Sequence, residues 1–484
     1  MAVDRVGGHH VVMAFLLYDA RGLERRSREV AAPERRRASR RLWRVDLLQA
    51  AAVATVAVAV ALFLADGGAA GIGDPGGALT ALGIVAGLIA TDLVLVMLVL
   101  AARVPLIERA VGQDAAMGLH RKLGKPVLYL LLAHAVLLVA GYAAADGSGL
   151  VGEIVSLWNT PDIPLAVLGL GLFLAVVVTS LVAVRRRFRY EVWHGIHLLV
   201  YGAVLAALPH QFSLGGLFAE GTWQRWYWLL LTIAAFAAVV VYRFGLPVYR
   251  SLRHRLVVEA VEPVGPAADG VVSIRLRGDD LERLGATGGQ FFVWRFLTRG
   301  QWWQAHPYSL SAAPRGGHLR ITVRALGRGS AGLASIRPGT RVALEGPYGI
   351  FSEASRSRSR LVLVAAGIGV TPIRSLLESA RFRPGEATVL LRTRSADEGW
   401  LLHEVRELCR TRGATLITIP GARGAGWLSA DAERQGLSLV EFAPEVRDSD
   451  VYVCGPLGWS EAVVAEARAA GLRPDQIHHE RFDW

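Results

Sequence analysis

Four histidines lie inside two long apolar segments of the sequence. His120 and His134 are fourteen residues apart on one segment, and His197 and His210 are thirteen residues apart on another. An ionisable side chain inside a bilayer is costly and usually serves a function, and neutral imidazole is a good axial ligand for haem iron. The four histidines therefore predict metal ligands within a membrane, with hydrogen bonds between helices as the alternative explanation.

The spacing of the histidines predicts how they pair. Fourteen residues are close to four helical turns, so His120 and His134 face nearly the same way, about 21 Å apart along the helix axis. Both segments start at the same side of the membrane, which places His120 level with His197 and His134 level with His210. Two helices that each carry two ligands predict two haems stacked through the bilayer.

The second histidine segment departs from ideal helical geometry. Thirteen residues leave its two imidazoles out of phase, and Pro209 is expected to kink or end the helix beside His210. His194 lies one turn before His197 and is a competing ligand. We favour His197, because its spacing is closest to that of the other helix.

Six apolar segments are long enough to span a bilayer. Hydrophobic residues make up 52% of the 484-residue chain and charged residues 19%, which is typical of a membrane protein. The segment with His197 and His210 is the weakest prediction, because it opens on charge. The expected spans are 45–65, 78–101, 123–143, 162–184, 190–209 and 226–243.

The basic residues predict the orientation of these spans. Arginine is dense in residues 1–44 and recurs on alternate flanks, whereas the opposite loops 66–77 and 144–161 contain no Lys or Arg and loop 211–225 contains only Arg225. Basic flanks stay in the cytoplasm, so both termini should be cytoplasmic in a multi-pass plasma membrane protein. The same clustering argues against nucleic acid as the reason for the net charge of +12. Residues 1–44 are expected to be an Arg-rich cytoplasmic tail close to anionic membrane lipid.

The sequence pattern of the second half of the chain predicts two soluble domains. Alternating strands at 255–261, 271–277 and 319–325, separated by Gly- and Pro-containing turns, predict a small antiparallel barrel. From 358 a strand–helix–strand pattern predicts a parallel α/β sheet. The expected domains are a transmembrane domain at 45–245, a barrel at 254–354 and an α/β domain at 358–484, with 352–360 as the linker between the last two.

A nucleotide site is predicted in the α/β domain. The sequence GIGVTP at 367–372 follows an apolar strand. Gly367 and Gly369 permit a tight turn close to phosphate, Thr371 can cap the next helix, and Pro372 suits the first turn of that helix. The helix N-terminus would then face a pyrophosphate.

Two further groups of residues extend this predicted site. Arg392 and Arg394 end the next strand and could hold the 2′-phosphate of NADPH, or could be inert surface charges. Cys454, Gly455 and Pro456 close a later strand at the edge where such sheets bind ligands. A buried, unreactive Cys454 is the alternative for the thiol.

A flavin site is predicted in the barrel. HPYSLS at 306–311 offers the ring of Tyr308 and the hydroxyl of Ser309, and VRALGRGS at 323–330 offers Arg324 with the small residues Gly327, Gly329 and Ser330 for a diphosphate. Composition alone would equally fit ordinary strands and turns. With only Cys409 and Cys454 in the chain, a disulfide framework and a cysteine-based zinc or iron–sulfur site are excluded on count.

In this order the motifs resemble the ferric reductase and NADPH oxidase superfamily over nearly the whole chain after residue 45. The resemblance rests on LHRKLG at 119–124, the histidine pairs, GQF at 289–291, HPYSLS, GPYG at 346–349, GIGVTP, CGP and the C-terminal ERFDW. It implies a six-helix membrane domain with two haems b, followed by a ferredoxin-reductase-like module that binds FAD and NADPH. His306 stands where the oxidase branch also has histidine and many other relatives have arginine.

The resemblance also implies roles for individual residues. His120 and His197 would bind the inner haem, and His134 and His210 the outer haem. His306, Pro307, Tyr308 and Ser309 would hold the flavin, and Gly367, Gly369, Thr371, Cys454, Gly455 and Pro456 would border the nicotinamide nucleotide. A C-terminal aromatic ring would stack on the flavin where the nicotinamide enters, and the match to ERF favours Phe482 over Trp484.

Three functions follow as expectations from this resemblance. The first is reduction of extracellular ferric iron or another metal chelate by NADPH. The second is reduction of dioxygen to superoxide, and the third is delivery of electrons to a protein partner. A transporter with a fused reductase domain is a more remote alternative, and it would bind no haem.

Overall fold

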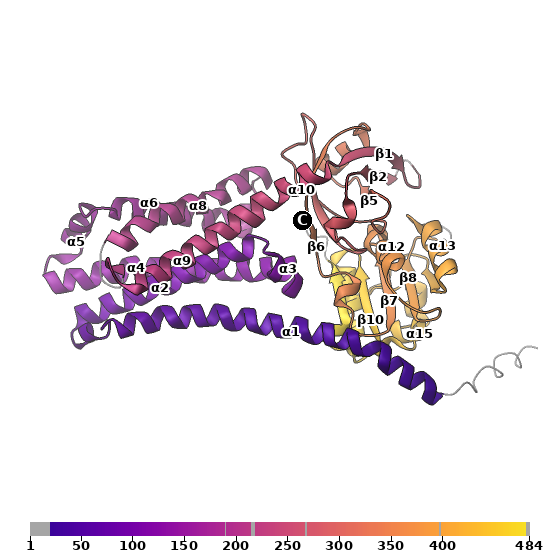
Figure 1. The fold of residues 1–484 in the computed structure, drawn as a ribbon, viewed down its shortest axis with the longest axis horizontal. Coiled ribbons are helices and arrows are strands. Elements are labelled where there is room, and N and C mark those ends of the chain that lie inside the picture. Colours follow the sequence, from indigo (N-terminus) through magenta and orange to yellow (C-terminus); the bar gives the residue numbers. More distant parts are fainter. Residues whose placement is uncertain (1–19, 189, 214–217, 267–268, 396–397, 481–484) are drawn as a thin grey trace, which may run out of the picture.

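The computed structural model describes residues 20–188, 190–213, 218–266, 269–395 and 398–480. The predicted flavin-stacking residues Phe482 and Trp484 lie outside the described residues. Long helices form one half of the molecule, and two sheet-containing domains form the other half (Figure 1). The boundary between the halves falls at the end of helix α10 (Figure 1).

Among the described residues, the first half contains six helices that are long and apolar enough to cross a membrane, as predicted. The spans are Trp43–Ala65, Pro75–Ala101, Gln113–Asp146, Ile163–Ser180, Glu191–Ser213 and Trp223–His254. The helices of this half are α1 (Ala20–Ala65), α2 (Pro75–Ala101), α3 (Pro105–Val111), α4 (Gln113–Asp146), α5 (Gly149–Trp158), α6 (Ile163–Ser180), α7 (Val182–Arg185), α8 (Tyr190–Ser213), α9 (Trp223–Ala238), the π-helical turn η3 (Val239–Gly245) and α10 (Leu246–His254).

Three helix boundaries differ from the predictions. Helix α1 begins at Ala20, so residues 20–44 are helical and continuous with the first span. Helix α4 begins at Gln113, ten residues earlier than predicted, and therefore contains His120. Helix α8 continues through Pro209 to Ser213, so the proline does not end the helix.

Small residues let the spanning helices approach closely. A Cβ atom added to Gly141 of α4 would lie 2.4 Å from the Thr80 hydroxyl of α2. A Cβ atom on Gly169 of α6 would lie 2.7 Å from the Ala203 carbonyl of α8. Membrane helices associate by such packing because lipid supplies no hydrophobic drive between them. The bundle thus contains two close helix pairs, α2 with α4 and α6 with α8.

The first soluble domain is antiparallel, as predicted, and its strands divide into two sheets. Two three-stranded sheets have the orders β1-β2-β5 and β4-β3-β6, and the bridges Val257–Arg341 and Leu310–Ile321 join their edges. Phe292, Trp294 and Phe296 of β3 fill the interior. The strands are β1 (Val257–Pro263), β2 (Val271–Arg277), β3 (Phe291–Phe296), β4 (His306–Ser309), β5 (His318–Arg324) and β6 (Val342–Tyr348), with a short helix α11 (Arg328–Ala331) after β5.

The second soluble domain is a five-stranded parallel sheet with the order β11-β10-β7-β8-β9. Chain order reverses between β7 and β10, which is the place where open α/β sheets bind ligands. Two buried clusters cover the two faces of the sheet. Its elements are β7 (Arg360–Ala366), α12 (Val370–Ser379), β8 (Ala387–Arg392), α13 (Leu402–Arg412), β9 (Thr415–Ile419), α14 (Ala430–Arg434), α15 (Leu439–Phe442), β10 (Ser449–Cys454), α16 (Leu457–Ala469) and β11 (Ile477–Glu480).

The predicted linker at 352–360 is packed into the second soluble domain. Arg356 and Ser357 are each 2% exposed. The carboxylate of Asp450 accepts hydrogen bonds from the Ser357 amide at 2.8 Å, the Ser357 hydroxyl at 3.0 Å and the Arg358 amide. The Nε2 atom of His478 lies 2.8 Å from the same carboxylate. This buried acid therefore ties the segment to β10 and β11.

Replacing Asp450 should destabilise this domain. Asp450→Ala leaves buried N–H groups of Ser357, Arg358 and His478 without an acceptor, which costs about 3 kcal/mol. We expect the thermal transition of the full-length protein, followed by near-UV circular dichroism in detergent, to fall by several degrees. Asp431→Ala, which removes an exposed ion pair with Arg434, is the control and should leave the transition nearly unchanged.

Candidate functional site

The four membrane histidines face one another in two pairs between α4 and α8. The ring centroids of His120 and His197 are 6.0 Å apart, and those of His134 and His210 are 6.5 Å apart. The structure thus brings together the residues that the sequence paired, at two levels of the bundle. His194, one turn before His197, belongs to neither pair, and its charged neighbours are Arg243, Arg295, Arg103 and Glu345.

Helix α2 holds the two imidazoles of α4 in place. The Nδ1 atom of His120 lies 3.2 Å from the Met97 carbonyl, and the Nδ1 atom of His134 lies 2.8 Å from the Gly83 carbonyl. A hydrogen bond from Nδ1 to a carbonyl fixes the tautomer and leaves Nε2 free to bind a metal. The Nδ1 atom of His197 lies 3.4 Å from the Ser180 hydroxyl of α6.

The separation of each pair suits an axially ligated haem. Metal–imidazole bonds are about 2 Å long, so an iron between two imidazoles separates their ring centroids by roughly 6 Å. Among the described residues, no cluster of three or more His, Cys, Asp or Glu side chains could hold a metal ion by itself. Two imidazoles at each level suit a metal whose other ligands come from a macrocycle.

The Gly-rich turn and the Cys454 loop lie side by side at the carboxyl ends of β7 and β10. Gly367 has a φ of +57°, and a Cβ atom added to Gly369 would lie 2.2 Å from the Cys454 carbonyl. The N-terminus of α12 opens beside this contact, so its free amides could bind a pyrophosphate. Pro372 lies in the first turn of α12, as predicted. Thr371 does not cap α12, because its hydroxyl donates to the Ile368 carbonyl at 2.9 Å.

The two arginines after β8 have different surroundings. The guanidinium of Arg392 donates to the carbonyls of Thr393, Ile419, Gly421 and Ala422, with the last three at 2.9, 2.8 and 2.7 Å. These four carbonyls make Arg392 a clamp between β8 and the loop after β9, and partial burial lowers its pKa. Arg394 is exposed. Of the two, Arg394 is therefore the better placed to bind a phosphate.

Unpartnered buried polar atoms mark the predicted flavin strand. His306 and Ser309 of β4 are 6% and 4% exposed, yet His306 Nε2 and the Ser309 hydroxyl have no hydrogen-bond partner among the described residues. The same holds for the Oε1 atoms of Gln301 and Gln304. A buried polar atom without a partner is costly. These atoms fit a bound molecule that supplies hydrogen bonds, such as a flavin and its diphosphate.

The two aromatic rings of the predicted flavin strand β4 stack on each other. His306 and Tyr308 stack at 5.8 Å between centroids, with planes 9° apart. Burial raises the pKa of Tyr308 to about 12 and lowers that of His306 to about 4. Both rings are therefore neutral at physiological pH. Pro307, between them, lies opposite Val293 of β3.

Two of the residues at or after the end of β5 that were predicted to bind the diphosphate already have partners within the protein. Gly329 is close to His306, since an added Cβ atom would lie 3.3 Å from the His306 ring. The Ser330 hydroxyl accepts from the amides of Leu326 and Gly327 at 2.9 and 3.0 Å, so it stabilises its own turn. Arg324 points toward the nucleotide domain, with its guanidinium 4.9 Å from the centroid of Trp400.

The sequence reading missed the residues that join the two soluble domains. Trp400 donates to Asp269 of the barrel at 3.0 Å. Glu404 of α13 forms ion pairs at 2.8 Å with Arg320 of the barrel and with Arg374 of α12. The only signal was a tryptophan within a polar loop. These contacts hold the barrel and the α/β domain against each other.

Both cysteines are buried, and their thiols should be unreactive in the folded protein. Burial raises the pKa of Cys454 well above its usual range and that of Cys409 to about 11. We expect iodoacetamide at pH 8 to label neither cysteine in the native protein and both after denaturation, as measured by mass spectrometry. Labelling of native Cys454 at the rate of a free thiol would show that the cleft opens.

The membrane half matches a known family. Residues 86–208 match the family described as the ferric reductase like transmembrane component. This stretch contains His120, His134 and His197 and ends two residues before His210. The membrane domain is of the ferric reductase type. In the chain, this domain precedes an antiparallel β domain and a five-stranded parallel α/β domain.

Relatives with named functions resemble parts of the chain. A flavohemoprotein of Vibrio cholerae is 35% identical over 188 residues, which are 36% of this chain and 45% of that protein. NADPH oxidase 1 of Mus musculus is 29% identical over 187 residues, which are 37% of this chain and 29% of that protein. The chain thus spans about half or less of the length of these relatives. The solved FAD/NAD-binding domain of a Vibrio cholerae nitric oxide dioxygenase is 24% identical, with a TM-score of 0.36, and covers 48% of this chain and 99% of that domain.

Proposed function

We propose that this protein transfers electrons from cytoplasmic NADPH to an acceptor outside the cell, with FAD and two b-type haems as its cofactors. The observation that carries the proposal is that two pairs of histidine rings lie at two levels of one membrane bundle. Paired imidazoles at two depths of a bilayer suit two haems that pass electrons across it. The membrane bundle is joined directly to a reductase-type module.

In this proposal each cofactor has a residue set within its own domain. His120 and His197 bind the inner haem and His134 and His210 the outer haem of the transmembrane domain, 45–245. His306, Pro307, Tyr308, Ser309, Arg324, Gly329 and Ser330 surround the flavin in the barrel domain, 254–354. When bound, the flavin would accept the two electrons of a hydride and the haem irons would accept them singly.

The nucleotide would lie at the switch point of the domain 358–484. Gly367, Gly369, Thr371 and Pro372 shape the turn for its pyrophosphate, and Gly455 and Pro456 form the facing loop. Arg394 would contact the 2′-phosphate, while Arg392 holds the loop that carries this side of the site. The predicted roles of Cys454 and Phe482 place them beside the nicotinamide.

The preferred acceptor is extracellular ferric iron or another metal chelate. The description of the matching family as a ferric reductase component supports it. Dioxygen is the second candidate, supported by the similarity to an NADPH oxidase. Delivery to a protein partner is a third possibility, and it predicts slow turnover with either small acceptor and acceleration by the partner. In the proposed orientation both termini are cytoplasmic.

The acceptor can be decided by NADPH oxidation with purified, haem- and FAD-loaded protein. Superoxide is scored in parallel with a dismutase-sensitive probe, first in oxygen and then under anaerobic conditions with a ferric chelate. We expect slow turnover in oxygen and rapid anaerobic reduction of the chelate. Fast, oxygen-dependent turnover that yields superoxide would instead make the protein an oxidase.

The haem assignment can be tested through the glycine that faces His134. A Cβ atom added to Gly87 would lie 2.4 Å from His134 Nδ1, so Gly87→Ala should displace the imidazole. His134→Ala and Gly87→Ala should each lose about half of the bound haem, measured as haem per protein by its absorption spectrum. Gly202→Ala on α8, where nothing lies within 4 Å, is the control. Full haem content in His134→Ala would show that the ligand assignment is wrong.

A further inference from the structure

A buried carboxylate lies where the barrel meets the membrane bundle. Glu345 of β6 is 5% exposed. Its Oε2 atom lies 2.8 Å from Nη1 of Arg103, in the loop between α2 and α3, and 2.8 Å from Nη1 of Arg243, in the π-helical turn. Its Oε1 atom pairs with Arg295 of β3. One barrel carboxylate thus holds two arginines of the membrane domain and one of its own domain.

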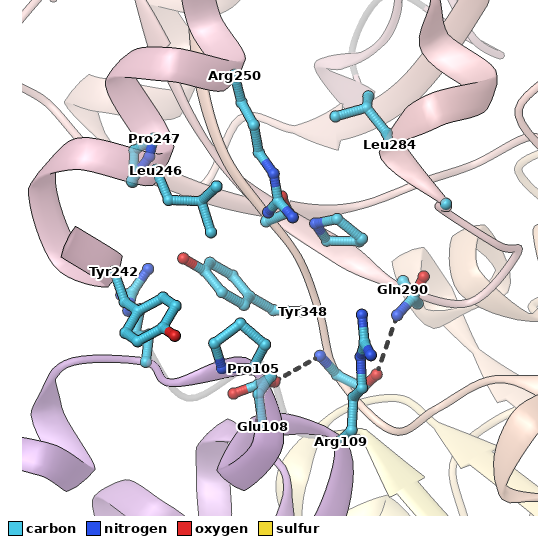
Figure 2. A pocket seen from close by; sticks show the side chains of 15 residues that line it. Pro105, Glu108, Arg109, Tyr242, Leu246, Pro247, Arg250, Leu284, Gln290 and Tyr348 are labelled. Carbon is cyan, nitrogen blue, oxygen red and sulfur yellow. Dashed lines mark hydrogen bonds between the residues drawn. The ribbon is translucent and has the colours of Figure 1, made fainter. Parts of the chain in front are cut away.

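The rest of β6 is fastened to the same membrane segments. The amide of Leu344 donates to the Ser251 hydroxyl of α10 at 3.0 Å, and Arg250 donates to the Gly346 carbonyl. The amide of Gly349 donates to Glu108 of α3 at 2.9 Å. Figure 2 shows Arg250, Tyr348 and Glu108 around a cavity of about 130 Å³ between these segments. Glu345 is therefore the charged centre of the junction between the two domains.

Glu345 is ionised despite its burial. Burial alone would raise the pKa of its carboxyl, but the attraction of Arg243, Arg103 and Arg295 holds it below its usual value. Without the carboxylate, three guanidinium groups would converge on one site with no counter-charge. Ion pairs of this kind stabilise a protein weakly, because desolvation offsets their attraction, but they fix one geometry.

The cluster lies between the two predicted cofactor regions. On the membrane side, Arg243, Arg295 and Arg103 are charged neighbours of His194, which precedes His197 by one helical turn. On the barrel side, Arg295 is a charged neighbour of His306. Strand β3, which carries Arg295, pairs with β4 of the flavin site, so that Trp294 lies opposite His306. Charges of this cluster therefore act on His194, one turn from the inner histidine pair, and Arg295 also acts on His306 of the flavin strand.

We propose that Glu345 is the positioning residue that docks the flavin strand on the inner end of the membrane bundle and so sets the rate of electron transfer between them. The transfer part rests on the proposed function; the docking part does not. Arg103 and Arg243 are the membrane-side partners of this dock. The π-helical turn that carries Arg243 is a rare geometry, usually found at functional sites.

The test uses the full-length protein with Glu345→Gln, which keeps the shape of the side chain and removes its charge. Hydrogen–deuterium exchange of the backbone amides in β6 measures docking directly, in protein with and without cofactors. Anaerobic stopped-flow mixing with NADPH separates flavin reduction from haem reduction. Glu404→Gln is the matched control, because Glu404 also holds two arginines, but at the boundary between the barrel and the nucleotide domain.

We expect Glu345→Gln to speed exchange of the amides of 344–346, 348 and 349 at least tenfold and to slow haem reduction at least tenfold, with flavin reduction within twofold of wild type. Glu404→Gln should leave exchange at 344–349 unchanged. Arg103→Gln, which leaves two arginines on Glu345, should give a smaller effect of the same kind and serves if Glu345→Gln does not fold. Unchanged exchange, or unchanged haem reduction in a variant with looser exchange, would overturn the proposal.

A failure of the proposed function would look different. In that case NADPH would reduce no haem in the wild-type protein, whatever the state of the junction. The exchange measurement would still decide whether Glu345 docks the barrel. The two ideas can therefore fail separately.

Discussion

The two imidazole pairs depend on the close approach of α2 to α4. Met97 and Gly83 of α2 offer carbonyls to His120 and His134, and Gly87 leaves room for the His134 ring. A helix normally keeps its carbonyls for its own backbone, so these second contacts need the short distance that small residues allow. Helix α2 thus orients the imidazoles of α4 without itself contributing a predicted ligand.

In the soluble half, the barrel and the α/β domain also support each other. The interior of the barrel is filled by buried apolar side chains such as Phe292, Trp294 and Phe296. The parallel sheet offers a cleft only where its order reverses, between β7 and β10. Trp400 and Glu404 hold the α/β domain against the barrel.

Patterns local in sequence were predicted well. Apolar length indicated the six spans, and the spacing of His120 and His134 indicated two levels. Contacts between distant segments were not predicted. Arg103, Arg243 and Arg295 each resemble an ordinary basic flank or strand residue, and only the fold brings them to Glu345. For Arg392 the end of the strand was correctly placed, but three of the four carbonyls that occupy its guanidinium come from β9 and the following loop, far away in the sequence.

The path of the chain from α9 to β1 has a mechanical consequence. Helix α9, the π-helical turn and α10 form one uninterrupted helical segment from Trp223 to His254, and β1 begins at Val257. Each residue added to or removed from an α-helix turns whatever follows by about 100°. A chimera that exchanges the reductase module must therefore preserve the number of residues in α10. The length of this helical segment therefore fixes the rotation of the soluble domains about the helix axis.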